Sequence, residues 1–162
     1  MGLTMVVVVV GKFLVFAGLI WSAANDVVSR IIPNWLVLTV GGGGVILRLA
    51  TAERHGMWAS AGVAGILFVA LRLLSGFGAL GGGDVKMLAA VTLGQPPAAM
   101  LPILLAIGVT GGGIAMFYLI REWLRRRNAS QVACGSPRRL EMPYAPAILA
   151  GVVWHELSSL AT

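Results

Sequence analysis

Residues 5–26, MVVVVVGKFLVFAGLIWSAAND, form an apolar run that carries one internal charge, Lys12, and ends on an acid, Asp26. A bilayer core needs about 20 apolar residues in a helix, so residues 5–25 are predicted to span a membrane. A secretory signal is the alternative, but the run is too long for one and no basic segment precedes it. We therefore expect a membrane-embedded helix here.

The composition predicts a membrane protein as well. The 162 residues are 58% hydrophobic and 11% charged, whereas an ordinary soluble domain carries about 25% charged residues. We expect a single integral-membrane domain over residues 1–162, because a bundle of spans leaves too few residues for a separate soluble unit.

The other apolar segments predict the remaining helices of a bundle. Residues 84–94 are helical by propensity but too short to cross, and QPP at residues 95–97 ends them. We expect a short, partly embedded helix there, sheltered by its neighbours. Further full spans are predicted over residues 34–50, 57–75, 98–120 and 143–161. The expected fold class is all-α, a polytopic membrane bundle of about six helices.

The basic residues predict the orientation of the bundle. Arginines are concentrated between residues 121 and 139, so the positive-inside rule predicts a basic cytoplasmic loop over residues 121–142 and an N-terminus outside the cell membrane. Lys12 and Arg48 then fall in the outer half, where we expect their side chains to snorkel. The 12 basic residues against 6 acidic ones indicate contact with anionic lipids rather than with nucleic acid.

No metal site and no cofactor are predicted. The single cysteine, Cys134, excludes an internal disulfide and a multi-cysteine zinc site. His55 and His155 fall on the predicted outer side, so we assign them no chemistry.

The 6 acidic residues divide by their predicted position. Asp26 ends the first span and Asp84 begins the short helix, both near the predicted inner face. The others lie on the outer side or flank the arginines: Glu53, Glu122, Glu141 and Glu156. Two converging carboxyl groups can activate a water molecule, one as base and one as acid. Asp26 and Asp84 are therefore the candidate catalytic residues.

The aspartates also have a structural explanation. Each has a base nearby in sequence, so Asp26 could pair with Arg30 and Asp84 with Lys86. If both are catalytic, the helix dipoles predict their roles. Asp84, at a helix N-terminus, would be the general base, and Asp26, at a helix C-terminus, the proton donor.

Glycine runs suggest where chains approach closely. Glycine leaves the main chain accessible, so an extended substrate could bind against residues 81–83, just before Asp84. Lys86 could contact that substrate or anchor its helix among headgroups. Residues 41–44 and 111–113 lie inside predicted spans, where small residues let helices pack closely.

The motifs around the two aspartates resemble those of the type IV prepilin peptidase family, most of all its small peptidase-only members that serve Flp or Tad pili. Residues Gly81 to Lys86 match the family's GxGDxK pattern. Asp26 is followed at the family's distance by Ile32-Pro33-Asn34. The segment MPYAPAILAG, residues 142–151, is similar to the segment that opens the family's last span.

The resemblance implies an aspartic endopeptidase that removes the leader peptide from pilin-like precursors at the cytoplasmic membrane face. Asp26 and Asp84 would be catalytic. The implied substrate-binding residues are Gly81, Gly82, Gly83, Lys86, Pro33, Asn34 and Tyr144. Larger relatives carry paired CxxC zinc ligands and methylate the new N-terminus. This chain lacks the CxxC pairs, so we expect no N-methyltransferase activity.

Two other functions account for part of the pattern. A presenilin-like intramembrane aspartic protease shares the GxGD signature and a second aspartate. A small proton-coupled transporter would use the acids as a proton relay, but it leaves the glycine run and Ile32-Pro33-Asn34 unexplained. Ala145 stands where the family usually has glycine, which leaves the substrate preference open.

Overall fold

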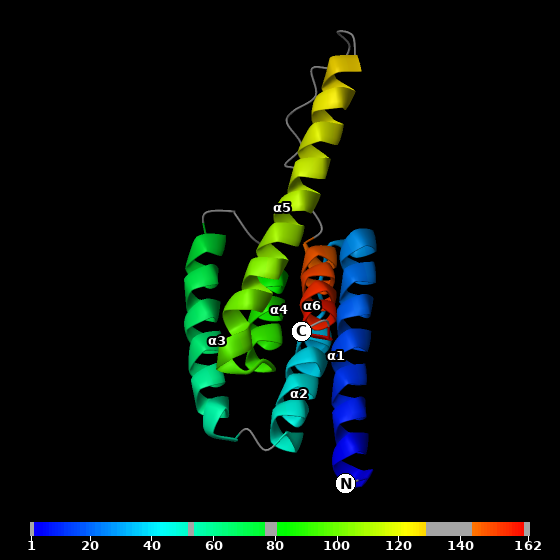
Figure 1. Cartoon of the computed structure of the whole chain (residues 1–162). Coiled ribbons are helices and arrows are strands. Elements are labelled where there is room, and N and C mark those ends of the chain that lie inside the picture. The colour runs from blue at the N-terminus through cyan, green and yellow to red at the C-terminus, as the bar shows by residue number, and fades with distance from the viewer. Residues whose placement is uncertain (1, 52–53, 77–80, 129–143, 161–162) are drawn as a thin grey trace.

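The fold is a bundle of helices, as expected. The computed structural model describes residues 2–51, 54–76, 81–128 and 144–160, and the regular elements within them are all helices. These helices are α1 (Gly2–Ser29), α2 (Asn34–Ala50), α3 (Arg54–Ser75), α4 (Gly82–Leu93), α5 (Pro97–Asn128) and α6 (Ala145–Leu160). Figure 1 shows the helices packed side by side, with the second half of α5 projecting beyond the others. The predicted all-α fold class is confirmed.

Among the described residues, three helices are long and apolar enough to cross a membrane: α1, the segment Gly56–Ser75 of α3, and the segment Pro97–Arg125 of α5. Apolar side chains cover the outside of these helices. Phe13 is 70% exposed, Ile66 72% and Val109 75%. Such a surface suits lipid rather than water, so the chain is a membrane protein.

The short helix α4 forms the centre of the bundle. Its Val85 and Met87 are fully buried, and Leu88 and Val91 are nearly so. A helix that is apolar on several sides must be covered by other helices, and α4 packs against α2, α3 and α6. At 12 residues, α4 is too short to cross a bilayer.

Glycines allow the helices of the bundle to touch through their backbones. A Cβ atom at Gly43 of α2 would lie 3.1 Å from the Gly11 carbonyl oxygen of α1. One at Gly151 of α6 would lie 2.6 Å from Cα of Ile107 in α5. Gly112 and Gly113, by contrast, face open space. Close packing is therefore a property of individual glycines, rather than of every member of the runs that the sequence presents.

The end of α5 differs from the prediction. We expected a loop from residue 121, but the helix continues to Asn128 and carries Arg121, Arg125 and Arg127. Leu, Glu and Arg are good helix formers, and no glycine or proline interrupts residues 114–128, so helix propensity prevails over the charge. Residues 129–142 of the predicted loop lie outside the described residues, as do Glu53, Cys134 and Glu141.

Lys12 and Arg48 do not snorkel as expected. The Lys12 Nζ atom lies 3.1 Å from Oε2 of Glu156, which joins α1 to α6. Arg48 is 2% exposed, and its Nη2 donates to the Ser60 hydroxyl of α3 at 3.4 Å. Ser60 in turn donates to the Gln95 carbonyl oxygen in the turn between α4 and α5. Each basic residue thus has a polar partner within the bundle, a carboxylate for Lys12 and a hydroxyl for Arg48.

We predict that Gly151→Ala destabilises the protein, because the new Cβ atom would meet the Ile107 backbone and force α5 and α6 apart. The expected loss in the free energy of unfolding is about 1–3 kcal/mol. Gly112→Ala is the matched control, since nothing lies within 4 Å of its position. Thermal unfolding in detergent measures both variants, and equal midpoints would contradict the prediction.

Candidate active site

Two helix ends far apart in sequence meet at Asp26. The Asp26 side chain is 6% exposed, and its Oδ2 accepts a hydrogen bond from the Ala145 backbone N–H at 2.9 Å. Ala145 is the first residue of α6, where backbone N–H groups have no partner inside the helix. A carboxylate from α1 thus caps α6. Proline at position 146 suits the start of that helix, because the first turn does not need its missing N–H.

Asp84 shares this end of the bundle with Asp26. It lies in the first turn of α4. Burial raises the pKa of Asp84 from 3.8 to about 6, the charge of Asp26 adds to the rise, and a hydrogen bond from the Gly81 backbone opposes it. A carboxyl group responds to a like charge in this way only when the two are near each other. The structure therefore brings the two predicted acids together.

The contacts oppose the division of roles that we predicted for these acids. Asp26 ends α1, but its carboxyl group meets the N-terminus of α6, which donates a hydrogen bond to it. Asp84 is at a helix N-terminus as expected, yet burial and the neighbouring charge favour its protonated form. Dipole reasoning on each helix alone missed the contact made by a third helix.

Tyr144 comes to the site from the residue before α6. A Cβ atom at Gly111 of α5 would lie 2.9 Å from the Tyr144 hydroxyl oxygen, so the ring rests directly on that glycine. Burial raises the pKa of Tyr144, and the charge of Asp84 raises it further. Tyr144 therefore lies within electrostatic reach of Asp84. Gly111 was expected to serve helix packing, and its contact with Tyr144 was not predicted.

The linker between α1 and α2 covers one side of the site. Arg30 has a φ angle of 54°, and this left-handed residue turns the chain out of α1. The linker then passes Gly83, where a Cβ atom would lie 3.1 Å from Cβ of Ile32. Pro33 precedes the first residue of α2 in an extended conformation. The Ile32-Pro33-Asn34 motif is thus in contact with the glycine run.

Lys86 contacts a residue of this linker. Its Nζ donates to Oδ1 of Asn34 at 2.9 Å, which joins α4 to the start of α2. Within the described residues, no ion pair joins Lys86 to Asp84, so the structural pairing that we considered for Asp84 is not observed. Lys86, two residues after Asp84, is therefore hydrogen-bonded to Asn34.

The three glycines before Asp84 differ in their surroundings. Gly81 lies under the Asp84 carboxyl group, since a Cβ atom there would be 2.8 Å from Oδ2, and Gly83 lies against Ile32. Gly82 has nothing within 4 Å of that position. Gly81 and Gly83 therefore allow close contacts within the site, and Gly82 leaves its main chain accessible. In the described part of the chain, no three His, Cys, Asp or Glu side chains form a group that could hold a metal ion.

The profile of the type IV leader peptidase family matches residues 13–116. The match includes Asp26, the linker motif, the glycine run and Asp84, and it ends before Tyr144. Neither a curated protein nor a solved structure gave a significant match to the chain.

We predict that Asp84 titrates near pH 6 and that Asp26→Asn lowers this midpoint while leaving it above 3.8, because burial remains and the like charge is lost. The chain contains two aspartates, so labelling the aspartate carboxyl carbons with ¹³C gives two NMR signals, and the variant retains that of Asp84. Glu122→Gln is the control and should leave the Asp84 midpoint in place. If the Asp84 midpoint is the same in Asp26→Asn as in the parent protein, the two groups do not interact.

Proposed function

The chain belongs to the type IV leader peptidase family, and from this premise we propose that it is an aspartic endopeptidase whose catalytic residues are Asp26 and Asp84. Its substrates are pilin-like precursors of the Flp or Tad type, from which it removes the leader peptide. One observation carries the proposal: the carboxyl group of Asp26, from α1, lies close enough to that of Asp84, from α4, to raise the pKa of Asp84. Such a pair can activate water without a metal ion.

The contacts of the two acids support one division of their roles. Asp26, which accepts the Ala145 N–H, acts as the general base and takes a proton from the attacking water. Asp84, whose pKa is raised to about 6, donates its proton to the oxygen of the scissile carbonyl group. The tetrahedral intermediate then collapses. Asp26 passes its proton to the leaving nitrogen, the C–N bond breaks, and Asp84 recovers a proton from the intermediate's hydroxyl.

The substrate binds in extended form beside Asp84. Gly82 offers an accessible main chain next to the acid, which an extended peptide can approach. Tyr144 borders the site near α5, and Asn34 and Lys86 border it near α2. Gly81 and Gly83 serve this site through their close contacts, because any larger side chain there would displace Asp84 or Ile32.

The reaction takes place at the cytoplasmic face of the cell membrane. Arg121, Arg125 and Arg127 lie on the part of α5 that projects from the same end of the bundle as the ends of α1 and α6 that meet at Asp26 (Figure 1). The positive-inside rule assigns such a cluster to the cytoplasm, where it meets anionic headgroups. The N-terminus of α1 is then outside. The sequence has one cysteine, so it cannot supply paired CxxC zinc ligands, and N-methylation is not part of the activity.

We predict that the purified protein cleaves a Flp-type precursor at the end of its leader, and that Asp26→Asn and Asp84→Asn each lower kcat by about 10³-fold, as expected when one of two acid-base groups is lost. Mass spectrometry of the products gives the cleavage position and the mass of the new N-terminus. Gly112→Ala is the control for the purified variants.

Other outcomes would separate the alternatives. Cleavage within the apolar helix of the precursor would favour a presenilin-like intramembrane protease. Full activity in either aspartate variant would exclude the two-acid mechanism. No cleavage by the parent protein would leave the proton relay of a transporter as the better account. A methylated product would contradict the expected absence of methyltransferase activity.

We predict that Lys86→Met and Asn34→Ala have similar effects, each lowering kcat by about threefold, because each removes the same exposed hydrogen bond between α4 and α2. A direct contact of Lys86 with the substrate would instead raise KM in Lys86→Met and not in Asn34→Ala. Steady-state kinetics on a precursor peptide distinguishes these two roles.

A further inference from the structure

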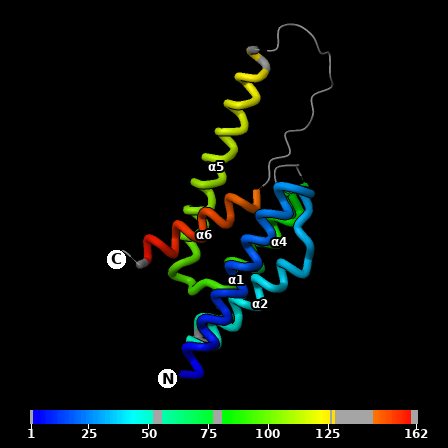
Figure 2. Tube along the Cα trace, turned by 90° about the vertical axis from the view of Figure 1, so that its right-hand side faces the viewer, coloured from blue at the N-terminus to red at the C-terminus, as the bar shows by residue number. Residues whose placement is uncertain are grey.

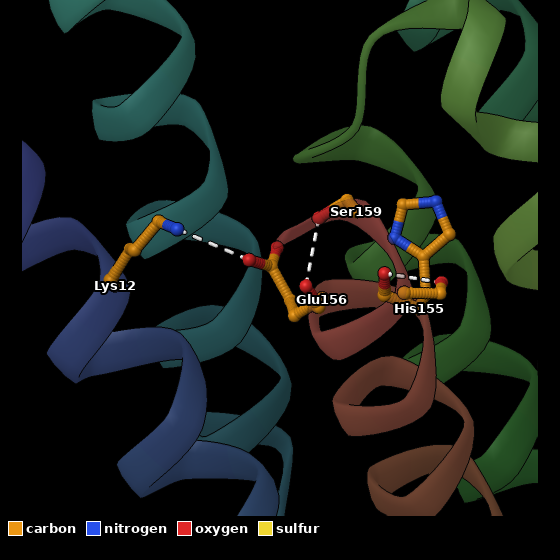
Figure 3. Close-up of polar contacts among 5 residues, drawn as sticks. Lys12, His155, Glu156 and Ser159 are labelled. Carbon is orange, nitrogen blue, oxygen red and sulfur yellow. Dashed lines mark hydrogen bonds and ion pairs between the residues drawn. The ribbon is translucent and has the colours of Figure 1, made fainter. Parts of the chain in front are cut away.

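An ion pair joins α1 to α6 at a distance from the aspartates. The Lys12 Nζ and Glu156 Oε2 atoms face each other at 3.1 Å, as Figure 3 shows. The side chains are 53% and 30% exposed on helices whose outer surfaces are mostly apolar. A charge in such surroundings is expensive unless it is paired, so an intramembrane pair needs a reason to be there. His155 points away from this pair in the same view.

The ion pair joins two helices that a hydrogen bond also joins at the candidate site. That hydrogen bond runs from Ala145 to Asp26 at the start of α6. At 1.5 Å per residue, Lys12 lies about 21 Å from Asp26 along α1, and Glu156 about 17 Å from Ala145 along α6. The helix that delivers an N–H group to the general base is therefore held to α1 at both ends.

The ion pair lies beside a small cavity between α1 and α6. Figure 2 shows α6 leaning away from α1 toward its C-terminal end. A cavity of about 30 Å³ opens there, lined by Phe16 of α1, Val152 of α6, Gln95 and the ion pair itself. A cavity of this size can hold a water molecule among polar groups. The ion pair bridges α1 and α6 beside this cavity, so its attraction adds to the apolar contacts around it.

We propose that Lys12 and Glu156 are positioning residues for the catalytic centre: their ion pair fixes the inclination of α6 against α1 and so keeps the Ala145 N–H on the Asp26 carboxylate. The inference rests on the proposed function, because the position of the Asp26 carboxylate affects the rate only if Asp26 is catalytic. Neither residue contacts the substrate. A small rotation of α6 about its crossing with α1 would displace Ala145, and displacements of about 1 Å at a catalytic group can cost as much as 100-fold in rate.

The test is a charge exchange at the two positions. Lys12→Glu places two carboxylates opposite each other, and Glu156→Lys places two ammonium groups there, so each single variant should lower kcat about tenfold with KM within twofold of the parent. The double variant Lys12→Glu/Glu156→Lys restores the attraction and should recover at least half of the lost kcat. Lys12→Met/Glu156→Gln removes the pair without leaving a lone charge and should stay low.

Controls separate positioning from folding. Arg125 and Glu122 form an ion pair at 3.2 Å within α5, remote from α6, so Arg125→Gln should leave kcat unchanged. Rates are expressed per folded molecule, using the thermal unfolding transition of each purified variant in detergent. Unchanged kcat in both single variants, or a double variant as slow as they are, would overturn the inference. A loss that disappears on correction for the folded fraction would overturn it too.

The same assay keeps this inference apart from the proposed function. Asp26→Asn and Asp84→Asn are measured beside the charge variants. Activity in the aspartate variants would refute the two-acid mechanism whatever the charge variants do. Inactive aspartate variants beside fully active Lys12→Glu and Glu156→Lys would refute only the positioning role.

Discussion

The hydrogen bond from the Ala145 N–H to the Asp26 carboxylate is the contact on which the arrangement of the site depends. A helix that begins inside an apolar bundle has backbone N–H groups that water cannot satisfy, and each would be costly if left alone. Here α1 supplies the acceptor. The need of α6 for a cap and the need of the site for an oriented carboxyl group are therefore met by one interaction.

The buried helix α4 explains why the second acid can stand opposite the first. A helix of 12 residues starts and ends within the bundle, so its first turn lies where the ends of α1 and α6 meet. The glycines allow this crowding, since Gly81 makes room for the Asp84 carboxyl group and Gly83 for Ile32. A longer helix in this place would span the bilayer and carry its first turn into water.

Much of the fold could be predicted from sequence, because each helix is a local apolar pattern with local stop signals. Residues 34–50 were predicted as a span and form α2. Motif spacing also indicated Asp26 and Asp84. The missed features are pairings between distant segments: Ala145 with Asp26, Gly111 with Tyr144, and Lys12 with Glu156. Periodicity gives the faces of a helix but not which ends meet, and so the contact between the start of α6 and Asp26 could not be predicted.

The length of α5 has a mechanical consequence. Its 32 residues extend about 48 Å, whereas the hydrocarbon core is about 30 Å thick, so the arginine-bearing tip stands in the aqueous phase. The same helix carries Gly111, on which Tyr144 rests. A protein or lipid that pulled on the tip would tilt α5 and move Gly111 beneath the Tyr144 ring. A force on the exposed tip of α5 would thus be transmitted to the interior of the bundle.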